Sequence, residues 1–123
     1  MLALKSVLAA GDATPTLVFD EVDVGVGARS GQSVGEKLWS LSTRHQVIVI
    51  SHLAQIAAFA ETHYMIEKDV AGGRTTTAVV RLEGPQRTDE LAEMIDGKPV
   101  SPESRAAAEQ LLERVSGLKR ADT

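Results

Sequence analysis

TLVFDE, residues Thr16–Glu21, decides the fold of this chain, because a short apolar run ends there in two adjacent carboxylates. A strand covered on both faces can be apolar throughout and still deliver polar residues at its carboxyl end. Ligands of open parallel sheets bind at those carboxyl ends. The stretch therefore predicts a buried strand that presents Asp20 and Glu21 to a ligand, with a strand followed by an ordinary acidic turn as the alternative.

The residues around this strand predict an alternation of strands and helices. Helices are expected over residues 1–10, 29–43, 53–61, 87–95 and 101–118, and further strands over 46–50, 62–68 and 75–82. The order strand, helix, strand, helix, strand in the first half of the chain favours an α/β fold with a mostly parallel sheet. A turn over 69–73 predicts a hairpin at the edge of that sheet, with the last helices flanking it.

Composition restricts the class of protein. The 123 residues suffice for one ordinary domain, and a hydrophobic content of 43% is typical of a globular chain. The absence of cysteine excludes disulfides and thiolate metal sites. The net charge of −4 weighs against a DNA-binding surface on this segment, because phosphate binding requires clustered Lys and Arg. No apolar run approaches the length of a membrane span, so no membrane association is expected.

A second apolar strand, Gln46–Ile50, also ends in polar residues, Ser51 and His52. Since the carboxyl ends of neighbouring parallel strands lie at one edge of a sheet, these residues and the two acids are expected to face one ligand. In nucleotide hydrolases a first acid holds Mg²⁺ and a second orients or deprotonates the attacking water. The set therefore indicates phosphate hydrolysis. A surface role for Glu21 and a structural role for His52 are the alternatives.

The motifs LVFDE, VDVGVG and VIVISHLAQIA, in this order, resemble the C-terminal half of the ATPase head of the RecN family. Members of this family are bacterial double-strand-break repair proteins related to SMC proteins and, more widely, to ABC-type ATPases with a P-loop. LVFDE matches the Walker B element, VDVGVG the D-loop, and SH the switch histidine of the H-loop. The opening MLALK resembles the helix that follows the family's signature motif. The resemblance implies a head segment over residues 1–118, followed by a disordered tail over 119–123.

The resemblance also implies a role for each matching residue. Asp20 would hold Mg²⁺ through water, and Glu21 would be the catalytic base or water-orienting acid. His52, the second catalytic residue, would sense the γ-phosphate of ATP. Asp23 would belong to the D-loop that reaches across a head-to-head dimer. The residues expected to bind the nucleotide or shape its site are Asp20, Asp23, Gly25, Gly27 and Gln55.

Other nucleotide-binding elements of the family are missing from these residues: no GxxxxGK[ST] phosphate loop, glutamine loop or LSGG-type signature occurs. In the family these elements lie upstream. The resemblance therefore implies half of an ATP site, inactive by itself and completed by the N-terminal half of the same head. It further implies a homodimer of heads, DNA bound through the complete protein, and a nucleoid-associated location in the bacterial cytoplasm.

Two other interpretations stay open. The chain could be a free-standing, non-catalytic interaction module that keeps the fold without the chemistry. It could also be half of the head of another SMC-like or ABC-type ATPase, although the glycine pattern after Asp23 weighs against that. Hydrolysis that appears only when the chain is mixed with a fragment carrying the phosphate loop would favour the first, catalytic interpretation.

Overall fold

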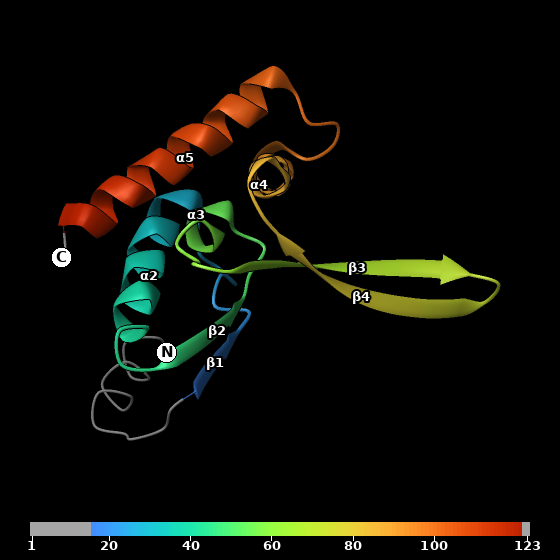
Figure 1. The fold of residues 1–123 in the computed structure, drawn as a ribbon, viewed down its shortest axis with the longest axis horizontal. Helices are drawn as coiled ribbons and strands as arrows, with labels where there is room; N and C mark the ends of the chain where they lie inside the picture. The colour runs from blue at the N-terminus through green and yellow to red at the C-terminus, as the bar shows by residue number, and fades with distance from the viewer. Residues whose placement is uncertain (1–15, 122–123) are drawn as a thin grey trace.

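The computed structural model describes residues 16–121, so the helix predicted over 1–10 lies outside the described residues. The predicted order of strands and helices is confirmed from residue 16 onward (Figure 1). The elements are β1 (Thr16–Asp20), α2 (Ala28–Leu41), β2 (Gln46–Ile50), α3 (Ala54–Ala57), β3 (His63–Ala71), β4 (Arg74–Leu82), α4 (Pro85–Asp96) and α5 (Pro102–Ala121).

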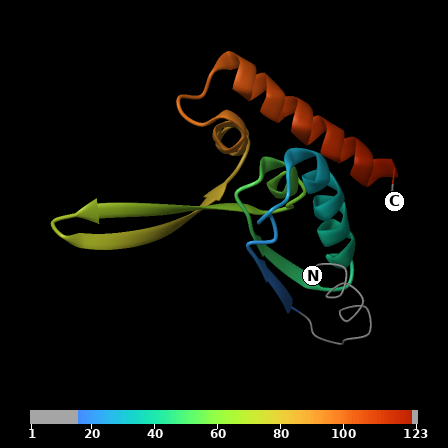
Figure 2. The same ribbon diagram turned by 180° about the vertical axis from the view of Figure 1, so that it is seen from behind.

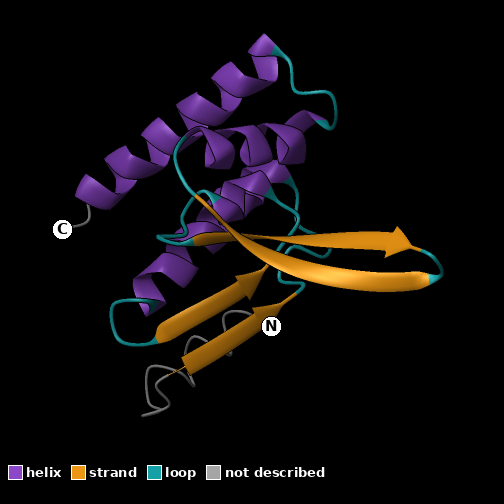
Figure 3. Cartoon of the chain, turned by 45° about the vertical axis from the view of Figure 1, so that its right-hand side comes forward, coloured by secondary structure: helices purple, strands orange, loops and turns teal. Residues whose placement is uncertain are grey.

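Strands β1 and β2 form a parallel pair joined through α2, with Thr16 opposite Gln46 and Asp20 opposite Ile50. Figure 3 shows the pair lying beneath the helices. The side chains alternate between the two faces of the pair. The inward face packs with Leu38 and Ile56 in one core, to which the strands contribute Leu17, Phe19, Val47 and Val49.

The outward face of the pair corrects the expectation that both strands are buried. Val18 is 57% exposed, Ile48 45% and Ile50 44%. The sequence gives these strands apolar residues on both faces, whereas the described residues cover only one of them. Three β-branched side chains therefore lie in solvent on one continuous strip, a pattern expected of a sheet with helices on both faces.

The hairpin β3–β4 forms a sheet of its own and not the edge of the parallel pair, which is a difference from the predicted arrangement. It is longer than expected because the turn shrinks to Gly72 and Gly73. Both glycines have positive φ, 59° and 77°, as tight hairpin turns require. Figures 1 and 2 show the hairpin projecting from the rest of the molecule.

Helices α3, α4 and α5 enclose a second core in which Leu91, Ala92 and Ala108 are fully buried. α5 begins as predicted: Ser101 Oγ accepts a hydrogen bond of 3.0 Å from the Ser104 N–H, and Pro102 stands at the first helical position. Helix α3 is shorter than the predicted 53–61. Within residues 16–121, no helix is both long and apolar enough to cross a bilayer.

The end of α5 corrects the expected disordered tail over 119–123. The helix continues through Ala121, and residues 122–123 lie outside the described part. The reason is a tertiary contact: Lys119 Nζ donates a hydrogen bond of 2.7 Å to the Phe59 carbonyl oxygen. A long side chain that is fixed at its tip holds the last helical turn against the body of the protein.

Candidate functional site

The carboxyl ends of β1 and β2 lie next to each other, as the sequence predicted. The in-phase register pairs Asp20 with Ile50. The Glu21 N–H extends this ladder by donating a hydrogen bond of 3.2 Å to the Ile50 carbonyl oxygen. Asp20, Glu21 and the Ser51–His52 turn therefore leave the sheet at one edge, which is where ligands of parallel sheets bind.

A side-chain network ties the two strand ends together. Asp23 Oδ2 accepts a hydrogen bond of 2.6 Å from the His52 backbone N–H and another of 3.0 Å from the Ser51 hydroxyl. Ser51 Oγ in turn accepts the Leu53 N–H at 3.0 Å. These bonds consequently join the loop after β1 to the turn after β2.

The charge state of Asp23 follows from these contacts. Partial burial raises the pKa of its carboxyl group, but the hydrogen bonds from the His52 N–H, the Ser51 hydroxyl and its own backbone, together with the nearby His52 charge, lower it by more. The result is a pKa below the ordinary value, so the group is a carboxylate at neutral pH. An ionised acceptor strengthens both hydrogen bonds.

Glu21 has an unusual backbone. Its φ is +55°, and it is the one described non-glycine residue with positive φ. Residues with a β-carbon adopt this conformation rarely, and such strain concentrates at functional sites. The kink turns the chain sharply out of β1: the Glu21 carbonyl accepts the Val24 N–H at 3.2 Å, and the Val26 N–H reaches the Asp23 carbonyl at 3.0 Å.

The two glycine positions of the loop differ in whether their backbone conformation requires glycine. Gly25 has a φ of +77°, so a side chain there would be strained. Gly27 is the N-cap of α2 with a φ of −84°, an extended conformation that any residue adopts. A β-carbon at Gly27 would meet no atom within 4 Å. The backbone therefore requires glycine at Gly25 but not at Gly27.

Gln55 lies half-buried in α3, on the side that packs against α2. A β-carbon added at Gly31 would lie 3.1 Å from the Gln55 Cβ and 2.5 Å from Leu53 Cδ2, so the helices are in close contact. Among residues 16–121, the side-chain hydrogen bonds at these strand ends involve Asp23 and Ser51. The structure thus joins Asp23 to the Ser51–His52 turn, whereas the side chains of Asp20, Glu21, His52 and Gln55 make no such bond within the described part of the chain.

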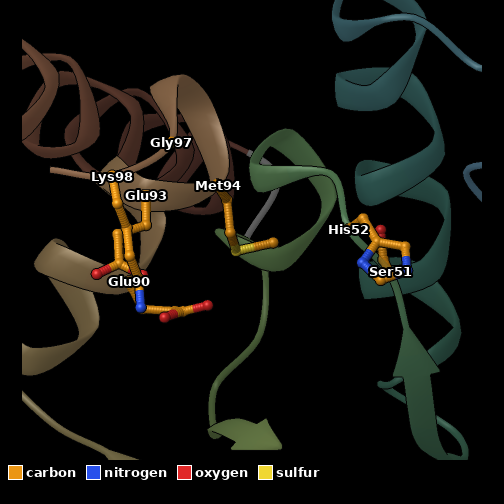
Figure 4. Close-up of a pocket in the computed structure, with 7 residues that line it drawn as sticks. All are labelled: Ser51, His52, Glu90, Glu93, Met94, Gly97 and Lys98. Carbon is orange, nitrogen blue, oxygen red and sulfur yellow. The ribbon is translucent and has the colours of Figure 1, made fainter. Parts of the chain in front are cut away.

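An open cavity of about 350 Å³ adjoins His52 and was not predicted from the sequence. Figure 4 shows Ser51 and His52 on one side and α4 with the loop after it on the other. The residues from that side are Glu90, Glu93, Met94, Gly97 and Lys98. Burial raises the pKa of Glu90, and the nearby charge of Glu93 adds to this while Lys98 opposes it. A Glu pair three residues apart on one helix face was the available signal, but such pairs are common on solvated helices.

The donor set is compatible with a magnesium ion held partly by phosphate. Among the described residues, no group of three His, Asp or Glu side chains is placed to hold a metal alone. Mg²⁺ in nucleotide sites needs only one or two carboxylates, with water and phosphate oxygens as its other ligands. The exposed carboxylate of Asp20 at the strand end meets that requirement.

The chain matches known proteins over almost its whole length. It is 44% identical over 112 residues to the DNA repair protein RecN of Treponema pallidum, which is 91% of this chain and 20% of the relative. The RecN of Mycobacterium leprae is 47% identical over 113 residues, covering 92% of the chain and 19% of the relative. The RecN of Bacillus subtilis is 39% identical over 119 residues, covering 97% and 21%. No protein-family model matches.

The chain therefore spans about a fifth of the length of these relatives. The resemblance to a C-terminal part of RecN is confirmed by these identities. A solved chain from work on the ATP-driven dimerization and DNA-stimulated activation of SMC ATPases superposes with a TM-score of 0.63. It is 21% identical and covers 80% of this chain and 58% of its own. This likeness establishes that the chain shares the α/β fold of that solved chain.

Proposed function

We propose, from the premise that this chain corresponds to the C-terminal segment of a RecN-type DNA repair protein, that it supplies half of an ATP-hydrolysing head. The observation that carries the proposal is the bond between Asp23 and the Ser51–His52 turn. It fixes two strand ends, each with polar side chains directed to solvent, in one arrangement. Catalysis by positioned groups requires such preorganisation.

Within this proposal each residue has a defined task. Asp20 would hold Mg²⁺ through its water shell, where the ion offsets the negative charge of the phosphates. Glu21 would accept a proton from the attacking water or orient that water toward the γ-phosphate. His52 would donate a hydrogen bond to the γ-phosphate and stabilise the charge that develops there. Asp23, Gly25 and Gln55 would shape the surrounding loops.

The exposed outward face of the β1–β2 pair supports the proposal that another half of the head covers it. Val18, Ile48 and Ile50 present an apolar strip that water would not normally contact in a parallel sheet. This chain spans only about a fifth of the length of its relatives, so they contain ample residues to cover the strip. We propose that the N-terminal half of the head packs there and brings the phosphate-binding loop, which this sequence lacks.

The larger role follows as part of the same proposal. Two heads would dimerise around ATP, with the Asp23 loop reaching toward the second head, and hydrolysis would reset the dimer. In the bacterial cytoplasm this cycle would regulate how the complete protein engages broken DNA during repair. The net charge of −4 fits a segment that leaves DNA contact to other parts of the protein.

The proposal is tested with an assembled head, meaning this chain combined with an N-terminal RecN fragment that carries a phosphate loop and a signature motif. We expect the two to co-purify, and ATP turnover to appear only in the mixture. Ile48→Ser should weaken the complex, whereas Val70→Ser on the hairpin should not. A stable complex without turnover would favour the alternative of a non-catalytic interaction module. Absence of any complex would contradict the half-head proposal.

A further inference from the structure

Two cations from the last two helices converge on the end of α3. α3 ends at Ala57, and the carbonyl groups that both cations contact belong to residues 57–60, at this end and just after it. Arg87 Nη2, from α4, lies 3.4 Å from the Ala57 oxygen, 3.1 Å from that of Ala58 and 2.7 Å from that of Ala60. Lys119 Nζ, from α5, donates to the Phe59 oxygen at 2.7 Å. Four consecutive carbonyls are thus held by two side chains.

The positions of both cations are themselves constrained. Lys119 Nζ lies 5.6 Å from the centre of the Trp39 ring in α2, so one side chain joins α5 to α2 and to the segment that follows α3. Arg87 is half-buried, and its Nε has no hydrogen-bond partner among residues 16–121. Leaving a guanidinium nitrogen buried without a partner is costly. The three-carbonyl contact of Nη2 offsets that cost and keeps the side chain in place.

The other end of α3 begins at the candidate site. Leu53 is the N-cap of the helix, and its carbonyl accepts the N–H groups of Ile56 and Ala57 at 3.1 Å. Its own N–H donates to Ser51 Oγ. We call the hydrogen bonds of Arg87 and Lys119 to the carbonyls of residues 57–60 the clamp. With about 1.5 Å of rise per residue, the clamped end of α3 lies on the order of 10 Å from His52. A helix of one turn transmits a tilt at one end directly to the other.

Close packing and the two cations together restrict the position of α3. A β-carbon at Gly35 of α2 would lie 2.3 Å from Phe59 Cδ2 and 3.2 Å from the Gln55 carbonyl oxygen. α3 is therefore pressed against α2 on one side. On the other side it contacts α4. The cations act at the same end, where Phe59 packs against Gly35, and add hydrogen bonds to that packing.

We propose that Arg87 and Lys119 are positioning residues, which hold α3 and through it aim the Ser51–His52 turn at the terminal phosphate. This inference rests on the proposed function. It deepens that proposal because it makes α4 and α5 part of the apparatus that sets His52. Movement of either helix relative to α2 would change the orientation of His52, so the clamp is also a route by which contacts on these helices regulate hydrolysis.

The test is a double-mutant cycle in the assembled head. Arg87→Gln should lower kcat for ATP by about tenfold to a hundredfold, with KM changing much less, because misplacement of a catalytic group mainly slows the chemical step. In a His52→Ala head, which is already slow, the same Arg87→Gln change should cost almost nothing further. Dependence of this kind is expected when one residue acts through another.

Two further variants provide a second test of the inference and its control. Lys119→Met keeps the stem over Trp39 but removes the bond to Phe59, and should give a smaller kcat loss that again disappears in the His52→Ala head. Arg105→Ala breaks the 2.9 Å ion pair with Asp89, which joins α4 to α5 without touching α3. It should leave kcat unchanged and so serves as the matched control.

The outcomes separate the inference from the function on which it rests. A loss from Arg87→Gln that is as large in the His52→Ala head as in the parent would overturn the clamp and leave the proposed function standing. A kcat loss in Arg105→Ala equal to that of Arg87→Gln would overturn it too, because any loosening of the helices would then suffice. A His52→Ala head with parental turnover would remove the role of His52 itself, and the clamp with it.

Discussion

The carboxylate of Asp23 accepts a hydrogen bond of 2.6 Å from the backbone N–H of His52, a residue 29 positions later in the chain. The Asp23 side chain therefore joins two loops of this chain, in addition to its proposed role in a dimer of heads. Because the acceptor is ionised and the donor is backbone, this contact survives replacement of the His52 side chain. The two residues can thus be tested independently.

Removal of the Asp23 carboxylate is the first prediction. Asp23→Ala leaves the His52 N–H and the Ser51 hydroxyl without an acceptor, so the free energy of unfolding should fall by about 1 kcal/mol at neutral pH. The melting temperature of the chain should fall by a few degrees. Asp23→Asn keeps one acceptor oxygen and should recover part of the loss. Since the folded pKa is lowered below 3.8, the stabilisation is present above that pH and fades as the pH falls through the lowered value.

A second prediction separates stability from chemistry at Glu21. Its φ of +55° is unfavourable for any residue with a β-carbon. Glu21→Gly should raise the free energy of unfolding by up to about 1 kcal/mol, although the more flexible unfolded glycine reduces the gain. Lys37→Gly, in the exposed middle of α2, should instead lower it by about 1 kcal/mol. Urea denaturation of the two variants checks the opposite signs; a loss in both would contradict the strained backbone.

The contact between α2 and α3 gives a third prediction. A β-carbon at Gly35 would lie 2.3 Å from Phe59 Cδ2. Gly35→Ala should therefore destabilise the chain by about 1–3 kcal/mol, despite the higher helix propensity of alanine. Gly117→Ala is the matched control in α5, because a β-carbon there meets no atom within 4 Å. It should stabilise by about 0.5–1 kcal/mol. Equal melting temperatures for the two variants would show that α3 is not pressed against α2.

The position of α3 also shows where the sequence ceases to predict the structure. Apolar runs that end in polar residues were enough to predict β1, β2 and the proximity of their carboxyl ends, because those features depend on local sequence. The bond from Arg87 to the Ala60 carbonyl spans 27 residues, and that from Lys119 to Phe59 spans 60. No local pattern signals either contact. For the same reason the sequence predicted the end of α5 too early, at Leu118.

Burial of His63 gives the fourth prediction, a pH dependence of stability. Burial lowers the pKa of the His63 imidazole, and the charge of Arg87 lowers it further. Its Nδ1 is buried without a hydrogen-bond partner among the described residues. Below the unfolded pKa of 6.5 the unfolded chain binds a proton that the folded chain resists. Stability should therefore decrease as the pH falls from 6.5 toward the lowered folded value.

The slope of this decrease can reach about 1.4 kcal/mol per pH unit for one histidine. His63→Leu, which removes the titrating group, should flatten the dependence in that window. Urea unfolding midpoints of the parent and the variant, measured in steps between pH 5 and 8, give the comparison. Identical slopes would mean that His63 takes up its proton equally well in the folded chain.

The fifth and most direct test measures ATP turnover by the assembled head that carries Glu21→Gln. If Glu21 accepts the proton of the attacking water, kcat should fall by about a hundredfold or more while ATP binding is kept. The variant should therefore retain unhydrolysed ATP and accumulate as nucleotide-bound dimers of heads, visible by light scattering. Turnover equal to that of the parent head would contradict the central claim that this strand end carries the catalytic base.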